Sequence, residues 1–486
     1  MSIEVSGDPG NIKWEVTTPS KGLAAAGKTL NMGSISIKPA LNAAGYYTIH
    51  AKNGDESVQA DFLVTGQMPT QPDTFFGVST HWGKSSFSEL WPLAETVPLV
   101  SELGFTRIRD ETAWASVQPS ATTFRVPEFA LEATSATSDA NFSQMLVAGY
   151  GNPGVFSKQS KDGLTPPVNN AMRNDFVEYI NTVLDKNPRI EAVEVWNEFN
   201  RPQRNTSACQ SGKCYAKLVA AVYDGVKAKH PEVKIVAGNT STTPIPWFSE
   251  FIAAGGLRHA DAISTHAYSN DIPTLLKNID ALDDLLRKNN EAKSIPIIVS
   301  EIGLSNTTSK SPAGDVGRVA NERQAAAGLV EILTSLKATP AVAAVYWYDA
   351  IDDGTALSDA QAHYGLFRQP SKSVSAFQPK QAAGSAASLI RLLSGFEMTS
   401  SSFEGDVRSF QFTNPSGDRR TVMWLETPFA DSSEKKENVS FRAFPEYDTS
   451  LVDFLGEPMR NELGVGSTSI QVTTDPVIVV ETRRTK

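Results

Sequence analysis

Residues Ala192–Asn200 read AVEVWNEFN, an apolar and β-branched run that changes abruptly to Asn197-Glu198. An apolar run of this length, bounded by polar residues, predicts a buried strand of a parallel sheet. A second stretch, IPIIVSEIG at Ile295–Gly303, has the same form and places Glu301 at the end of another buried strand. In barrel enzymes the carboxyl ends of the strands carry the active site. The two stretches therefore predict two glutamates that face one site.

Between residues 75 and 394, short apolar runs alternate with longer amphipathic stretches. We expect strands at Phe75–Thr80, Thr106–Asp110, Gln144–Tyr150, Ala192–Trp196, Lys234–Gly238, Ala262–His266, Pro296–Ser300 and Val342–Trp347. We expect helices at 87–103, 172–186, 214–229, 273–289, 318–337 and 379–394. This alternation predicts an α/β fold, a (β/α)8 TIM barrel. An open doubly wound sheet is the alternative, but no G-x-G-x-x-G or P-loop follows the first strand.

In the regions on either side of the barrel, apolar residues recur along the sequence with a different period. A chain of 486 residues is too long for one ordinary core. Residues 1–66 hold short alternating runs separated by Gly, Asn and Pro, which predicts a small N-terminal β-sandwich of the immunoglobulin-like kind. Residues 396–486 lose the helical period and predict a C-terminal β-sandwich. The barrel domain would then span residues 67–395.

The composition is that of a soluble globular protein, with 40% hydrophobic and 20% charged residues. The formal net charge of −10 argues against nucleic acid or an anionic membrane as a partner, and mildly against a strongly anionic polymer as substrate. No apolar run is long enough to span a bilayer. The composition carries no signal for the oligomeric state.

The chain has two cysteines, Cys209 and Cys214, which flank the polar sequence QSGK. This spacing predicts a disulfide that stiffens a loop and contributes about 2 kcal/mol, with two free thiols as the alternative. A disulfide favours an extracellular or periplasmic location. Because Met1–Glu4 does not resemble the start of a signal peptide, this location would require that the signal peptide has been removed. A cytoplasmic location is the alternative. No metal or cofactor is expected, because the six histidines form no H-E-x-x-H or comparable cluster.

Large polar and aromatic side chains follow most of the expected strands. Buried strand ends rarely carry so many of them without a ligand to meet, and a sugar offers hydroxyls at its edge and C–H groups on its face. Each residue also has a structural reading, as a buried ion pair, a hydrogen-bonded histidine or simple aromatic packing. The candidate substrate-binding residues are Trp82, Arg109, Trp114, Tyr150, Asn197, His266, Tyr268 and Trp347.

Three motifs, WNE at 196–198, THAY at 265–268 and SEIG at 300–303, resemble those of the retaining glycoside hydrolases of clan A. With the flanking sandwiches, the chain is most similar to family 39, over roughly residues 75–486. The resemblance implies that Glu198 is the acid/base, that Glu301 is the nucleophile and that Asn197 holds the sugar 2-hydroxyl. Phe199 stands where the family usually has Pro, which affects the shape of the neighbouring subsite.

A retaining mechanism needs one protonated and one ionised carboxyl group about 5–5.5 Å apart. We expect Arg109 and Tyr268 to favour the anion of Glu301, and that anion to raise the pKa of Glu198. The loops at 111–140 and 348–378 are expected to shape the cleft.

The sequence thus predicts a retaining β-glycosidase that cleaves a neutral oligo- or polysaccharide. One alternative is a catalytically inactive, carbohydrate-binding barrel. The other is a barrel enzyme of different chemistry, such as a metal-dependent lyase.

Overall fold

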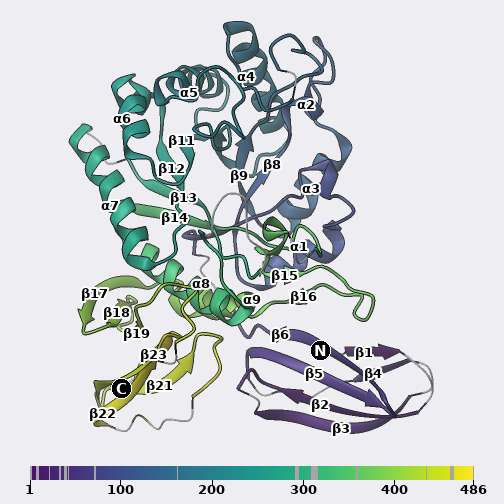
Figure 1. The fold of residues 1–486 in the computed structure, drawn as a ribbon, viewed down its shortest axis with the longest axis vertical. Coiled ribbons are helices and arrows are strands. Elements are labelled where there is room, and N and C mark those ends of the chain that lie inside the picture. Colours follow the sequence, from purple (N-terminus) through teal and green to yellow (C-terminus); the bar gives the residue numbers. More distant parts are fainter. Residues whose placement is uncertain are drawn as a thin grey trace.

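The computed structural model describes most of the chain, and every structural statement below concerns these residues. They are 3–6, 10–20, 22–31, 34–37, 41, 43–69, 73–160, 162–289, 295–307, 316–356, 359–433, 435–459, 463 and 465–484. Figure 1 shows a barrel with its helices, and two regions of antiparallel sheet beyond α8 and α9. Within the described part of the chain, every helix is too short or too polar to cross a membrane.

The central sheet is a closed barrel of parallel strands, so the predicted TIM barrel is confirmed. Its strands are β7 (Phe76–Ser79), β8 (Arg107–Glu111), β9 (Ser143–Ala148), β10 (Ile190–Val195), β11 (Lys234–Ser241), β12 (Ala262–His266), β13 (Ile297–Ile302) and β14 (Val342–Trp347). The pairing of β14 with β7, through Val345 and Phe76, closes the barrel and excludes the open doubly wound sheet.

Helices surround the barrel (Figure 1). They are α1 (Leu93–Glu102), α2 (Trp114–Val117), α3 (Glu128–Asp139), α4 (Asn170–Leu184), α5 (Gly212–Lys227), α6 (Ile245–Ala253), α7 (Ile272–Asn289), α8 (Glu322–Lys337) and α9 (Gln381–Leu393). The sequence analysis did not predict α3 and α6. The first is rich in Ser and Thr, whose helix propensity is low, and packing on the barrel decides it. The second has a proline in its first turn, which is a favourable start signal that the sequence analysis did not use.

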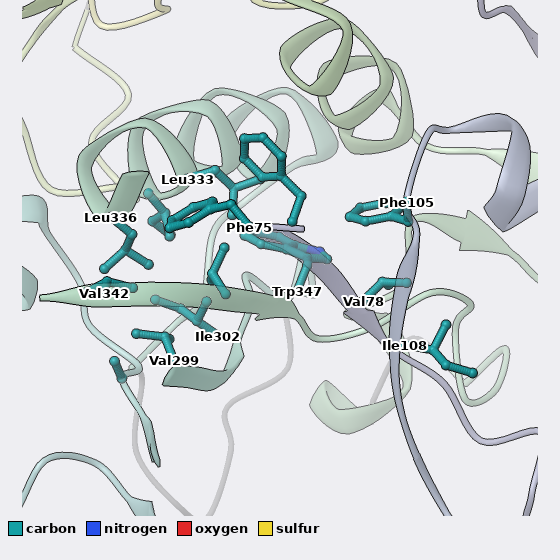
Figure 2. Packing of buried hydrophobic residues seen from close by; sticks show 14 of the residues in the cluster. Phe75, Val78, Phe105, Ile108, Val299, Ile302, Leu333, Leu336, Val342 and Trp347 are labelled. Carbon is teal, nitrogen blue, oxygen red and sulfur yellow. The ribbon is translucent and has the colours of Figure 1, made fainter. Parts of the chain in front are cut away.

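Side chains alternate between the two faces of each barrel strand. On β14, Val345 and Trp347 face the helices, where Figure 2 shows Trp347 among side chains that include Phe75 and Leu333. Tyr346 belongs to a separate cluster inside the barrel. The residue that follows Trp347 therefore points toward the barrel axis. This alternation of side chains between the two faces of a strand decides which strand-end residues reach the site.

The N-terminal region forms a four-stranded antiparallel sheet in the order β3-β2-β5-β6 and a two-stranded sheet β1-β4. The strands are β1 (Ile3–Ser6), β2 (Gly10–Thr17), β3 (Leu23–Asn31), β4 (Ser34–Ile37), β5 (Gly45–Asn53) and β6 (Glu56–Val64). The sequence analysis missed β3, whose Ala-rich run has a low β-propensity. Tyr46 of β5 donates a hydrogen bond to the carbonyl of Pro379, so this sheet is docked against the barrel domain.

The C-terminal region forms a five-stranded sheet in the order β17-β18-β19-β23-β21 and a two-stranded sheet β20-β22. Its strands are β17 (Glu397–Glu404), β18 (Val407–Thr413), β19 (Arg419–Leu425), β20 (Lys436–Ala443), β21 (Tyr447–Asp453), β22 (Gly466–Thr473) and β23 (Val477–Arg483). Phe412, Trp424 and Ile478 join the same apolar cluster as α8 and α9. Because the sheet covers the outer side of these helices, α8 is buried along most of its length.

One arginine connects the N-terminal sheet to the barrel domain. Arg368 donates two hydrogen bonds to Glu322 at the start of α8, at 2.7 and 2.6 Å, and a third to Asp61 of β6 at 3.0 Å. Its side chain is 29% exposed, so these ion pairs are only partly screened by water. Without the arginine, two carboxylates would face each other across this contact.

We expect Arg368→Gln to destabilise this contact by about 1–3 kcal/mol, between the values for exposed and buried pairs. Limited proteolysis should release the N-terminal sheet sooner than in the wild type, and thermal unfolding should begin at a lower temperature. Arg287→Gln is the matched control, because Arg287 is 70% exposed on α7 and pairs with Asp283 alone. Equal proteolysis of the two variants would contradict the role given to Arg368.

Candidate active site

Two glutamates meet at the carboxyl end of the barrel. Glu198 follows β10 and Glu301 lies in β13, and both approach His266 at the end of β12. The Nδ1 atom of His266 lies 3.3 Å from Glu198 Oε1 and 3.5 Å from Glu301 Oε2. The two oxygens are therefore no more than about 7 Å apart, which fits the roughly 5–5.5 Å of retaining pairs better than the roughly 6.5–9.5 Å of inverting pairs.

The backbone turns sharply where it presents Glu198. Trp196 and Glu198 have φ values of 68° and 50°, in the left-handed region that residues other than glycine seldom adopt. Two contacts with Asn239 of β11 hold this turn, because Glu198 N–H donates to the Asn239 carbonyl at 2.8 Å and the Asn239 side chain donates to the Trp196 carbonyl. Strain of this kind is typical of functional sites, where neighbouring structure fixes it.

Arg109 of β8 organises the floor of the site. It donates to Glu194 Oε2 at 2.8 Å, to Glu301 Oε2 at 3.1 Å and to Asn197 Oδ1 at 3.0 Å. Although burial opposes its charge, Glu194 and Glu301 raise the pKa of Arg109 above its usual value. The arginine therefore stays charged and orients Glu301. Glu194 could have been suspected from the sequence, since it is a carboxylate flanked on both sides by valine in β10.

His266 acts through the two glutamates because its side chain is fully buried. Its Nε2 atom lies 3.4 Å from an Arg109 nitrogen. Arginine only donates, so Nε2 must accept and Nδ1 must carry the ring proton. The Nδ1–H group thus donates to Glu198 Oε1 and lies 3.5 Å from Glu301 Oε2. His266 positions them, and substrate contact is not available to it.

Tyrosines complete the contacts of the predicted site. The Tyr268 hydroxyl donates to Glu301 Oε1 at 2.9 Å, and burial together with Glu301 raises the pKa of Tyr268, so it keeps its proton. The Asn197 amide donates to the Tyr150 hydroxyl at 2.8 Å. Glu301 therefore has both oxygens held by donors, one by Tyr268 and one by Arg109.

These residues surround a cleft of about 280 Å³. The loop at 348–378 contributes to it as expected, but the loop at 111–140 contributes Glu111 alone, and the segments after β10 and β11 replace it. Side chains that the sequence analysis did not single out also line the cleft: Lys84, Glu111, Arg201, Arg204, Tyr348 and Tyr364. Tyr348 could have been found from the alternation of side chains along β14, because the residue after Trp347 faces the barrel axis.

Three predicted sugar contacts were wrong, because Trp82, Trp114 and Trp347 lie in the apolar layer between strands and helices. Their exposed fractions are 3%, 0% and 1%, and none lines the cleft. Trp82 donates to the Thr96 hydroxyl, and Trp114 donates to the Gln118 side chain. These indoles stabilise the barrel by packing.

The expected rise in the pKa of Glu198 is also wrong for the free protein. Burial does oppose its charge, but His266, Arg201 and Arg204 outweigh burial and lower the pKa of Glu198 to about 2. Arg201 Nη1 lies 3.4 Å and Arg204 Nε 3.7 Å from Glu198 Oε2. The sequence analysis considered only the neighbouring carboxylate and missed the two cations that follow Glu198 along the chain.

The segment after Glu198 is a braced loop. Cys209 and Cys214 form a disulfide within it. Phe199, 3% exposed, packs against Tyr215 of α5 at a ring distance of 5.0 Å. This residue, which replaces the usual Pro, therefore fills the space beneath the loop and does not enter the cleft.

Among the described residues, His81, Asp349 and Asp353 form a group whose potential metal-ligating atoms lie within 4.8 Å of one another. His81 Nδ1 is already 3.0 Å from Glu111 Oε1. Burial, and next the charge of Asp353, raise the pKa of Asp349 well above its usual value. The raised pKa of Asp349 favours its protonated form beside Asp353.

Residues 166–377, which include both glutamates, match the family model described as the glycosyl hydrolase catalytic core. No curated protein sequence matches the chain. Among solved structures, the chain is similar to a family 39 glycoside hydrolase from Bacteroides cellulosilyticus WH2, with a TM-score of 0.80 and 20% identity over 99% of this chain and 97% of that one. This likeness extends the resemblance to the N-terminal sheets, which the sequence motifs did not cover.

Two further similar structures cover less of the chain. A family 39 β-xylosidase from Caulobacter crescentus has a TM-score of 0.56 and 14% identity over 86% of this chain and 98% of that one. The catalytic domain of family 30 xylanase C from Talaromyces cellulolyticus has a TM-score of 0.57 and 14% identity, over 85% and 98%. At these identities the likeness shows the fold. The match to the catalytic-core model over residues 166–377 indicates a glycoside hydrolase, as the sequence motifs predicted.

Replacing Arg201 and Arg204 together by Gln should raise the pKa of Glu198. If Glu198 is the acid that the sequence resemblance implies, the descending limb of a profile of kcat/KM against pH with an uncharged phenyl glycoside reports loss of its proton. We expect this limb to move up by about one to three pH units in the double variant, because a nearby opposite charge lowers a carboxyl pKa by that amount. Arg287→Gln should leave the limb in place. The same limb in wild type and double variant would show that the arginines do not control Glu198.

Proposed function

We propose that this glycoside hydrolase is a retaining β-glycosidase that cleaves an oligo- or polysaccharide by double displacement. One observation carries the proposal: a single atom, His266 Nδ1, contacts both Glu198 and Glu301. That distance bound favours direct attack by one carboxylate over a water molecule held between the pair. The disulfide Cys209–Cys214 supports an extracellular or periplasmic location for the enzyme.

The surroundings of the two carboxyl groups suggest their roles. Glu301 is held at both oxygens by Tyr268 and Arg109, which aim it, as a nucleophile requires. Glu198 Oε1 faces His266, while Oε2 faces Arg201 and Arg204 at the cleft. A carboxyl group with one oxygen toward the cleft can reach the glycosidic oxygen.

In the first step, Glu301 attacks the anomeric carbon while Glu198 gives its proton to the departing oxygen, and the C–O bond of the substrate breaks. A covalent glycosyl-enzyme results, with the charge of Glu301 consumed by the new bond. In the second step, Glu198 takes a proton from water as the water attacks the same carbon, and Glu301 leaves as a carboxylate. Asn197, fixed by Arg109 and Tyr150, is placed to hold a sugar hydroxyl through both steps.

Replacing Glu301 by Gln should abolish hydrolysis of every glycoside, whatever its leaving group, because no glycosyl-enzyme can form. Replacing Glu198 by Ala should cost about a hundredfold to ten-thousandfold with poor leaving groups and much less with an activated aryl glycoside. Azide needs no base, so it should restore turnover of the Glu198→Ala enzyme and give a β-glycosyl azide, identified by NMR. An α-azide would mean that the roles are exchanged, and full activity of both variants would make the pair structural.

A binding-only barrel would not need both glutamates, and a metal-dependent lyase would need an ion. A panel of aryl β-glycosides, assayed with and without a chelator, separates these classes. It should begin with aryl β-xylosides, because two of the similar structures are named a β-xylosidase and a xylanase. We expect hydrolysis that a chelator leaves unchanged. Loss of activity with chelator would favour the metal enzyme, and no hydrolysis of any member would favour the binding protein.

A further inference from the structure

Two arginines share one carboxylate on the cleft side of Glu198. Arg201 and Arg204 both line the cleft, and their side chains are 35% and 46% exposed. Glu198 Oε2 is the one carboxylate oxygen of the described residues with which either forms an ion pair, at 3.4 and 3.7 Å. Both distances are long for charge-assisted hydrogen bonds, so much of the donor capacity of the two guanidinium groups is unused.

The loop that carries these arginines has a fixed backbone. Trp196 Nε1 donates to the Arg204 carbonyl at 2.9 Å, and the fully buried Asn205 side chain donates to the carbonyls of Phe199 and Cys209. The disulfide ties the end of this loop, at Cys209, to the first turn of α5, at Cys214. Such bracing holds two cations at one place beside Glu198, which a merely exposed surface arginine does not require.

Two other cations on the cleft wall, Lys84 and Arg109, are paired with acids. Lys84 Nζ lies 2.9 Å from Glu111, and Arg109 contacts both Glu194 and Glu301. Beside Glu198, in contrast, two positive charges face one negative charge. The net charge of −10, from which a neutral substrate was expected, describes the whole chain and not this part of the cleft.

We propose that the leaving-group side of the cleft binds an anionic substituent of the substrate, a carboxylate or a sulfate, through Arg201 and Arg204. This inference rests on the proposed function, since it takes Glu198 as the proton donor. Oε1 of Glu198 is held by His266, which also contacts Glu301, and Oε2 faces the arginines, so we place the departing sugar on the arginine side. Planar guanidinium groups bind carboxylate and sulfate oxygens in pairs, which suits this ligand.

The bound anion would also prepare the proton donor. It draws both guanidinium groups away from Glu198 and adds a negative charge nearby, and both changes favour the protonated carboxyl group. The other groups that face Glu198 are His266 of β12, Glu301 of β13 and Tyr150 after β9, and binding leaves them in place. Substrate binding and uptake of a proton from solvent are therefore coupled. A sugar without the anionic group leaves Glu198 ionised and is a poor substrate.

The test is calorimetric binding to the full-length Glu301→Gln protein, with glucose, glucuronate and glucose 6-sulfate as probes. We expect at least one of the two anionic sugars to bind ten times or more tightly than glucose, with net proton uptake seen by repeating the titration in buffers of different ionisation enthalpy. The Arg201→Gln/Arg204→Gln double variant should lose the difference, and the Arg287→Gln control should keep it. Preference for glucuronate or for the sulfate identifies the group.

Equal binding of all three sugars, including no binding by any of them, would overturn the proposal. So would a double variant that still distinguishes the anionic sugars. This readout does not depend on catalysis. If binding shows the charge preference but the azide experiment and the glycoside panel show no hydrolysis, the anion site stands and the proposed function fails. If hydrolysis proceeds without the charge preference, the reverse holds.

Discussion

The site depends on a buried guanidinium group. Arg109 of β8 reaches Glu194 on β10, Asn197 beyond it and Glu301 on β13, and so ties three strands together across the barrel. Removal of one partner from a buried ion pair typically costs about 3–5 kcal/mol, because the remaining charge is left in a medium that cannot solvate it. Glu301 is thus a structural partner of Arg109 and also the group that we propose as the nucleophile. A glutamate at this position is therefore required both for stability and for the proposed function.

The two central glutamates differ in what surrounds them. Glu301 receives hydrogen bonds at both oxygens from groups of the barrel itself, whose positions are set by the strands. Glu198 is reached by His266 from the barrel and by Arg201 and Arg204 from a loop. The position of Glu301 is therefore set by the barrel, whereas the charge of Glu198 can respond to what enters the cleft. Hydrogen bonds from Trp196 and Asn205 hold the loop backbone, whereas the ends of the arginine side chains, 35% and 46% exposed, can turn.

The alternation of side chains between the two faces of a strand separates the aromatic residues that reach the cleft from those that pack against the helices. Trp347 lies on the helix side of β14, and Tyr348 follows it into the cleft. Both are large aromatics at a strand end, and residue type alone does not tell them apart. The alternation of side chains along each strand distinguishes them, once the apolar face of that strand is known.

The sequence by itself determined the barrel, the positions of its strands and the two glutamates, because buried parallel strands are continuous apolar runs and each glutamate directly follows or ends one. It also located Arg109, Asn197, His266 and Tyr268, which lie on or just after the same strands. Tertiary structure alone decided β3 and α3, whose local propensities are weak and whose stability comes from packing. It also decided the charge of Glu198, because electrostatic interaction depends on distance through space, and no spacing in the sequence states where Arg201 and Arg204 direct their side chains.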